Sequence, residues 1–368
     1  MSAPLSELAI TDETVLYLRP LCGAVAAAMP GARIGGAWAG FDHVEVIARQ
    51  GAKVARATVA LDDFGPWSAS LGVGHKERIE TLLTRITDRR QPMAGITFDQ
   101  PRFMGVLNVT PDSFSDGGDY ATAEAAIGRG RELIEGGAAV LDIGGESTQP
   151  GSDPVPVGEE LRRVMPVIEA LAHGDTGAVI SIDSRKARVM EEATAAGAAI
   201  INDISALTGD ARALSVAASS GAHVILMHCQ GEPKTMQEAP VYDQPPLEIF
   251  DYLEGRIGAC EAAGIVRGRI AIDPGIGFGK ALAHNLAILS HLSLFQGLGC
   301  PVLLGVSRKR FIAYITGAEG PKERLPGSLA AAMAGLAQGV QMLRVHDATE
   351  TNQAMGVWQA IHGAGAID

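Results

Sequence analysis

The chain has 368 residues, of which 47% are hydrophobic and 20% are charged, so it can bury a large core and is not expected to be disordered. Its net charge of −12 lacks the basic field of a general nucleic-acid binder, so we expect no nucleic-acid partner. None of the four cysteines forms a CxxC pair, which indicates free thiols in a reducing compartment.

The N-terminal segment gives no targeting or membrane signal. It is acidic where a signal peptide would be basic. The apolar run from Val15 to Met29 is interrupted by Arg19 and Pro20 and is too short to span a bilayer. We therefore expect a cytoplasmic protein with no membrane partner.

Residues 1–98 differ in pattern from the rest and predict a small α+β extension of unknown role. Thr11-Asp12-Glu13 is typical of a helix start. Residues 44–48 and 54–60 have the pattern of strands. Residues 76–88 place their apolar side chains on one helical face. No catalytic constellation occurs in this part of the sequence.

From residue 103 onward, short apolar runs alternate with longer segments of helical periodicity. Strict alternation predicts a parallel sheet, and eight such units fit a (β/α)8 TIM barrel of about 250 residues. The predicted fold class is therefore α/β, with a barrel over residues 99–368; a doubly wound sheet is the alternative. The expected strands are 103–108, 138–143, 178–183, 199–203, 223–228, 269–273, 301–306 and 341–346. The clearest expected helices are 121–135, 158–171, 186–196 and 247–262.

Polar residues follow at or near the end of each apolar run. In a barrel these ends gather around one mouth, whereas a doubly wound sheet would leave several of them far apart. The residues in question are Asn108, Asp142, Asp183, Asn202, Asp203, His228, Asp273, Ser307, Arg344 and His346.

The first polar segment belongs to the sequence FMGVLNVTPDSFSDGG, Phe103 to Gly118. An apolar run breaks at Asn108 into a turn-rich stretch of hydroxyls and carboxylates, more than an ordinary connection needs. Loops held by a strand often carry function, although a plain surface loop is the alternative. The second segment, VLDIGGESTQPGS, delivers Asp142 from a strand and then turns sharply at two glycines.

The next two segments are SIDSRKARV and IINDISAL. Asp183 ends a strand, and Ser184 is a candidate cap for the following helix. Asn202 offers both a hydrogen-bond donor and an acceptor, which suits the edge of a flat heterocycle. For Asp203 a helix-capping role is favoured.

The segments VILMHCQGEPKTMQ and IAIDPGIGFGK follow. His228 has no HExxH or cysteine partner spaced for zinc. The second segment fails as a Walker A motif, because proline stands at position 274 and Ala281 replaces the required hydroxyl. Asp273 is the better chemical candidate, because a carboxylate can accept two hydrogen bonds from an aminopyrimidine.

The last segments are LLGVSRKRFI and LRVHDA. The three cations from Arg308 to Arg310 would supply a local positive field, although a solvated charge run is the alternative. Arg344 and His346 alternate, so both face one side of a strand. An arginine can hold two phosphate oxygens at once.

In this order the motifs resemble those of the dihydropteroate synthase family of folate biosynthesis, a family of sulfonamide targets, over roughly the last 270 residues. The resemblance implies a transferase that condenses 7,8-dihydropterin-CH2-pyrophosphate with 4-aminobenzoate, giving 7,8-dihydropteroate and pyrophosphate. It implies that Asp183, Asn202, Asp273 and Lys309 are catalytic and hold the pterin ring. Mg2+ is the implied cofactor, with Asn108 as its candidate ligand, and a homodimer is implied. The implied substrate-binding residues also include Thr148, Met227, Phe278, Ser307, Arg344 and His346, the last two at the pyrophosphate.

One departure and two alternatives stand beside this resemblance. Gln149 occupies the position where the family usually has an arginine, which puts in doubt the role of the loop at 145–157. That loop and the one at 109–119 would close over the site and exclude water. A pterin-dependent methyltransferase is one alternative, but it would not need Arg344 and His346. A catalytically silent pterin-binding or assembly subunit is the other.

Overall fold

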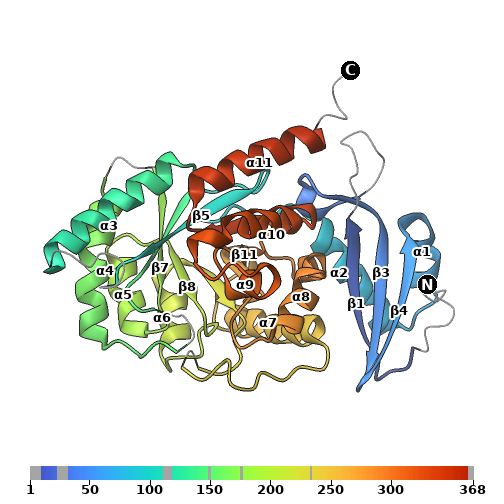
Figure 1. Ribbon diagram of the computed structural model, residues 1–368. Coiled ribbons are helices and arrows are strands. Elements are labelled where there is room, and N and C mark those ends of the chain that lie inside the picture. Colours follow the sequence, from blue (N-terminus) through green and yellow to red (C-terminus); the bar gives the residue numbers. More distant parts are fainter. Residues whose placement is uncertain are drawn as a thin grey trace.

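The computed structural model describes residues 10–22, 32–110, 118–147, 151–174, 177–232 and 234–363. It consists of a (β/α)8 barrel and a smaller α+β unit that lies against one side of the barrel (Figure 1). The predicted fold class is therefore confirmed.

The barrel sheet has eight parallel strands in the order β10-β9-β8-β7-β6-β5-β12-β11. A parallel bridge between Ile272 and Val302 joins the two ends of this order, so the sheet closes and the doubly wound alternative is wrong. The expected strands are matched to within about two residues. The strands are β5 (Arg102–Asn108), β6 (Val140–Gly144), β7 (Val179–Asp183), β8 (Ile200–Asp203), β9 (His223–Met227), β10 (Ile270–Asp273), β11 (Leu303–Gly305) and β12 (Met342–Val345).

The helices cover the outside of the sheet and bury one apolar face each. In α4, for example, Leu161, Val164 and Ile168 recur at helical spacing and are buried, while Glu159 in the first turn suits the positive end of the helix dipole. The helices are α3 (Gly118–Glu135), α4 (Val157–Ala172), α5 (Ala187–Ala195), α6 (Ala213–Ser220), α7 (Pro245–Ala262), α8 (Leu282–Leu289), α9 (Arg310–Thr316), α10 (Leu325–Ala337) and α11 (Ala348–Gly363), with short 3-10 turns η4 (Arg267–Arg269), η5 (Leu292–Leu298) and η6 (Lys322–Arg324).

The barrel interior changes from apolar to polar within two residues along the strands. An apolar cluster at the floor contains Met104, Val140, Ile200, Ala271 and Met342. Because side chains alternate between the two faces of a strand, the residue two positions further on points to the same side. Four of the residues at those positions are polar, namely Asp142, Asn202, Asp273 and Arg344, and Val106 is the apolar exception. The sequence therefore builds a polar layer directly above a hydrophobic floor.

The N-terminal unit is a four-stranded antiparallel sheet with two helices. The helix start expected at Thr11-Asp12-Glu13 is wrong. Thr14 donates its N–H to the Thr11 carbonyl at 2.9 Å and closes a turn, and the following residues pair with β3 as a strand. The elements are β1 (Val15–Cys22), β2 (Ala32–Arg33), η2 (Ile34–Gly36), β3 (Gly40–Gln50), β4 (Lys53–Ala60), α1 (Leu61–Ala69) and α2 (Val73–Thr87).

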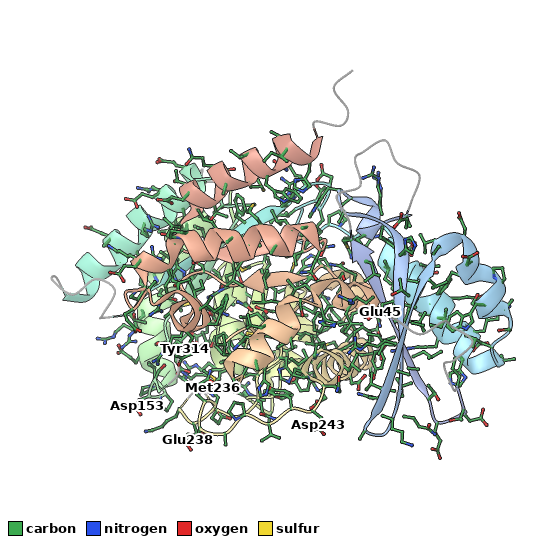
Figure 2. All side chains as sticks on the ribbon, turned by 45° about the vertical axis from the view of Figure 1, so that its right-hand side comes forward. Glu45, Asp153, Met236, Glu238, Asp243 and Tyr314 are labelled. Atoms are coloured by element: carbon green, nitrogen blue, oxygen red, sulfur yellow. The ribbon has the colours of Figure 1, made fainter. Side chains whose placement is uncertain are left out.

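The extension and the barrel share one continuous hydrophobic cluster. Tyr17 packs edge-on against Phe250 of α7 with ring centroids 5.4 Å apart, and its hydroxyl donates to Asp251 at 2.8 Å. All residues of η5 are buried at this junction. Figure 2 shows Glu45 on the side of the extension's sheet that faces the barrel, where it pairs with Arg19 at 2.8 Å. The extension therefore packs against the barrel through a buried hydrophobic interface that is continuous with the barrel core.

We predict that Phe250→Ala destabilises the whole described fold by about 3–5 kcal/mol, because it opens a cavity in the shared cluster. Denaturant unfolding should give a single transition by circular dichroism of the barrel and by fluorescence of Trp67 in the extension, measured in a Trp38→Phe, Trp358→Phe background. Val73→Ala, at a side chain that is 76% exposed, is the control and should change stability by about 0.5 kcal/mol or less. Two separate transitions in the wild type would contradict a shared core.

Candidate active site

The centre of the polar layer is an arginine held between two carboxylates. Arg344 of β12 donates from Nε to Asp142 Oδ2 of β6 at 2.7 Å and from Nη2 to Asp183 Oδ2 of β7 at 2.7 Å. Asn202 of β8 donates its amide to the same Asp142 oxygen at 2.9 Å. Side chains from four strands are therefore tied together across the mouth of the barrel.

Burial sets the charge balance of this cluster. It raises the pKa of Asp183 from 3.8 to about 7, with the Asp142 charge adding to the shift and Arg344 opposing it. Burial alone would lower the pKa of Arg344, but Asp142 and Asp183 outweigh it and raise the pKa. Asp142 Oδ1 is buried and has no hydrogen-bond partner among the described residues. Leaving a buried acceptor without a hydrogen bond destabilises the fold by about 1–3 kcal/mol. A ligand that donates a hydrogen bond to this oxygen would recover that free energy.

A second cluster lies beside the first, around Gly305 of β11. A methyl group added at Gly305 would lie 3.5 Å from Lys309 Nζ and 3.9 Å from Asp273 Oδ2, so these two side chains converge there. Lys309 also donates to the Ile276 carbonyl, and its Nζ lies 4.7 Å from the centroid of the Phe278 ring. The second cluster therefore combines the carboxylate of Asp273, the ammonium group of Lys309 and the aromatic ring of Phe278.

Burial and the charge of Asp273 act on the pKa of Lys309 in opposite directions. Burial lowers its pKa to about 8, although Asp273 opposes the shift. Burial likewise raises the pKa of Asp273, with Lys309 opposing. Asp273 accepts the N–H of Gly275 at 2.7 Å, which fixes the orientation of the carboxylate.

The loop that carries Phe278 is held in place by Lys280, a residue that was not among the expected site residues. Lys280 is 3% exposed, and its Nζ lies 3.0 Å from His228 Nδ1 and donates to the carbonyls of His228 and Phe278. Burial lowers the pKa of Lys280 to about 7 and that of His228 to about 3. A neutral His228 therefore accepts a hydrogen bond from Lys280 at Nδ1, and this contact holds the loop in place.

Ser307 and His346 form the third side of the mouth. His346 donates its backbone N–H to Ser307 Oγ at 3.2 Å, and its Nδ1 lies 3.0 Å from the same oxygen. Burial lowers the pKa of His346 to about 3, and the Arg344 charge adds to the shift. The imidazole is therefore neutral at physiological pH and can act as a hydrogen-bond donor or acceptor there.

Of the three consecutive cations, only Lys309 faces the carboxylates. Arg308 has a left-handed φ of 58° and turns away to pair with Asp347, with Nε 2.9 Å from Oδ2. Arg310 is exposed and lies over Tyr314. The expectation that the whole run supplies the local field is wrong, because the strained backbone at Arg308 sends neighbouring side chains in opposite directions.

Two capping expectations are also wrong. Ser184 does not cap α5; the N–H of Ala187 is instead accepted by Asp210 at 3.0 Å. Asp203 accepts from the backbone of Ser205 and Leu207 at 2.7 and 2.9 Å, which closes a turn rather than starting a helix. The sequence spacing in both cases resembled a cap because aspartate and serine satisfy turns and helix starts by the same bonds.

The expected site residues that the structure describes lie at one rim of the barrel; Thr148 is not among the described residues. Asn108, Asp183 and Asn202 share one row of the sheet register, and Met227 pairs with Asp273 in the next pair of strands. Thr148 and Gln149 lie outside the described residues. Asp142 was identified as a strand-end residue without a role, although its position two residues above Val140 could have placed it in the polar layer.

Among the described residues, no group of three or more His, Cys, Asp or Glu side chains could hold a metal ion. Across the same ranges, no helix is both long and apolar enough to span a bilayer.

Comparisons with known proteins agree on one family. Residues 104–346 match the model of the pterin binding enzyme family. A dihydropteroate synthase of Escherichia coli K12 is 47% identical over 265 residues, which cover 72% of this chain and 93% of that protein.

Solved structures give the same result. The chain superposes with a TM-score of 0.69 on Xanthomonas albilineans dihydropteroate synthase with 4-aminobenzoic acid, at 50% identity and covering 74% of this chain and 97% of that one. The same synthase with 7,8-dihydropteroate gives 0.67 at 48% identity, covering 74% and 98%. A Yersinia pestis dihydropteroate synthase with a sulfonamide drug complex gives 0.68 at 44% identity, covering 73% and 98%.

We predict that Asp183→Asn becomes more stable relative to the wild type as the pH rises from about 4 to about 7. The raised pKa means that the folded state holds the Asp183 proton more tightly than the unfolded chain does. The free energy of unfolding of the wild type therefore falls as Asp183 ionises over that range. Denaturant unfolding at several pH values measures the difference. Asp210→Asn is the control, because hydrogen bonds from the Arg212 and Ala187 backbone lower the pKa of Asp210. Its stability difference should stay constant from about pH 4 to 7 and change, with the opposite sign, only below about pH 4. A pH-independent difference for Asp183→Asn would contradict the assignment.

Proposed function

Because this chain belongs to the dihydropteroate synthases of the pterin binding enzyme family, we propose that the polar rim of its barrel carries out their reaction with the residues assigned below. The reaction joins 7,8-dihydropterin-CH2-pyrophosphate to 4-aminobenzoate, giving 7,8-dihydropteroate and pyrophosphate. The observation that carries the assignment is the convergence of Asp142, Asp183 and Arg344 in one hydrogen-bonded group beside Asp273 and Lys309.

The pterin ring would lie between the two clusters of the rim. Asp273 would accept hydrogen bonds from the ring N–H and the exocyclic amine, while Asn202 and Asp183 would contact the ring edge. Phe278 and Met227 would pack on its faces, where a thioether and an aromatic ring suit a flat heterocycle. The buried, unpartnered Asp142 Oδ1 supports this placement, because a ring donor would satisfy it.

The reaction breaks the bond between the methylene carbon and the pyrophosphate oxygen and forms one from that carbon to the aniline nitrogen. The aniline loses a proton, and pyrophosphate leaves with the bonding electrons. The carboxylates of Asp183 and Asp273 would stabilise the positive charge that develops on the ring. Lys309, whose pKa of about 8 leaves it mostly protonated at neutral pH, would instead donate a hydrogen bond to the pterin. No covalent bond to the enzyme is needed.

The leaving pyrophosphate would bind at Arg344, His346 and Asn108. Among the described residues, the Asn108 side chain makes no hydrogen bond, and its Oδ1 lies near Asp183 over Gly144. An amide oxygen is a hard donor of the kind that Mg2+ takes, and Mg2+ commonly needs few protein ligands beside phosphate oxygens and water. The donor set therefore fits Mg2+ held by Asn108 and the substrate. When bound, the ion would neutralise the charge of the leaving group.

The 4-aminobenzoate would enter beside Ser307 and Lys309. A hydroxyl and an ammonium are suitable partners for its carboxylate, and Thr148 is assigned as a further substrate-binding residue. The chain would be divided at residues 98 and 99 into the extension and the pterin-binding barrel. We also expect a homodimer in the cytoplasm; the exposed apolar side chains of Tyr314, Ile315, Val357 and Ile361 on α9 and α11 support such an assembly.

Steady-state turnover of the purified chain with both substrates tests this conclusion. Dihydropteroate formation should require both substrates, and chelation of Mg2+ should lower the rate by at least tenfold and be reversed by adding Mg2+. The control is pterin binding without pyrophosphate, which should persist after chelation because the ring contacts involve no metal. Pterin binding without any turnover would instead support the silent subunit.

A further inference from the structure

A cleft of about 740 Å³ lies between the extension and the barrel floor. Its walls are the η2 turn of the extension, residues 35–38, the connection at residues 89–92, and residues 97–99 of the barrel. Because residues 97–99 precede the N-terminal end of β5, the cleft opens at the opposite end of the barrel from the candidate active site. Its volume falls in the range of small-molecule sites.

Two neighbouring arginines in this cleft form no ion pair with any described residue. Arg90 is only 8% exposed, yet its guanidinium bonds neutral acceptors alone: the carbonyls of Arg85, Asp88 and Gln296, and Gln296 Oε1. Buried arginines are almost always paired with an anion. Burial lowers the pKa of Arg90 to about 10, so the group remains charged at neutral pH. Arg90 is therefore a buried charge without an ion-pair partner among the described residues, although the more distant charge of Asp88 acts on it.

One donor of Arg90 is also unused. Its Nε is buried and has no hydrogen-bond partner among the described residues. This atom lies behind Gly35 of the cleft wall, since a methyl group added at Gly35 would be 3.7 Å from it. An orphaned buried donor is rare in folded proteins and usually signals a missing acceptor.

Arg89 adds a second positive charge at the mouth. It is exposed, and within the described ranges it forms no ion pair or hydrogen bond. Its stem packs against Gly36, which has a φ of 66°, since a methyl group added at this glycine would lie only 2.8 Å from Arg89 Cγ. The one carboxylate of the lining, Asp99, is already held by Thr97 at 2.6 Å and Arg102 at 2.9 Å. The free charge facing the cleft is therefore positive.

The rest of the lining is apolar. Trp38, half-buried in the η2 turn, and Phe98 and Pro92 on the barrel side give the cleft aromatic and hydrophobic surface. The Trp38 indole N–H is used by the Leu336 carbonyl at 3.0 Å, which fixes the ring in place. A ligand here would meet a flat apolar wall next to two guanidinium groups.

We propose that this cleft binds a small organic anion, a phosphate or carboxylate on a ring or short apolar body, between the extension and the barrel floor. The anion pairs with Arg89 at the mouth and is attracted by the charge of Arg90 in the wall, and the apolar body packs on Trp38. Because the ligand touches both parts of the chain, its binding stabilises the docked extension.

Fluorescence of Trp38 tests the proposal directly. The double variant Trp67→Phe, Trp358→Phe leaves Trp38 as the single tryptophan of the chain. Phenyl phosphate, which combines a ring with a dianion, should change the Trp38 signal saturably and raise Tm. Benzyl alcohol, which has a ring without the charge, should do neither. No saturable change with phenyl phosphate, or an equal response to benzyl alcohol, would overturn the proposal.

Variants locate the binding. Arg89→Ala and Arg89→Gln, each in the single-tryptophan background, should weaken phenyl phosphate binding at least tenfold. Arg188→Ala, which removes another exposed arginine, is the matched control and should leave it unchanged. Arg344→Ala distinguishes binding in the cleft from binding at the active site. In this variant the response of Trp38 to phenyl phosphate should persist. A response lost in Arg344→Ala and retained in both Arg89 variants would assign the anion to the active site and refute the proposal.

Discussion

The ion pairs of Arg344 with Asp142 and Asp183 are the constraint on which the site depends. They join β12, β6 and β7 across the barrel mouth, at 2.7 Å each, in a buried environment. A buried ion pair contributes little net stability, but removing one partner leaves a charge that burial makes costly. The three strands must therefore keep one register, and that register places Asn108 and Asn202 at the same rim.

The hydrophobic floor beneath this layer makes the arrangement possible. Met104, Val140 and Met342 fill the barrel below the polar residues and exclude water from one side. The low polarity that results raises the pKa of Asp183 and Asp273 and lowers that of Lys309. The same alternation of side chains that fills the core thus tunes the groups that would hold a pterin ring.

Much of this could be predicted from the sequence, because strand ends in a parallel barrel are both recognisable and convergent. Asp183 binds Arg344, and Asp273 and Lys309 converge on Gly305, at the same end of the barrel. The sequence could not reveal that Arg308 adopts a left-handed φ, since arginine gives no such signal, and so the direction of its side chain was missed. The role of Lys280 in holding the loop of Phe278 could not be predicted either, because Lys280 contacts His228, which lies 52 positions away in the sequence. The shared core of the extension and the barrel likewise depends on long-range contacts.

The central claim is that Arg344 both organises the two carboxylates and receives the leaving pyrophosphate. The most direct measurement is calorimetric binding of pyrophosphate and of free pterin to the wild type, Arg344→Ala and Arg344→Lys. The account predicts that Arg344→Ala weakens pyrophosphate binding by about 10–100-fold, as expected for a charged hydrogen-bond partner, and weakens pterin binding much less. Arg344→Lys should restore only part of the loss, because an ammonium lacks the two-pronged geometry of a guanidinium. Equal losses for both ligands would contradict the account.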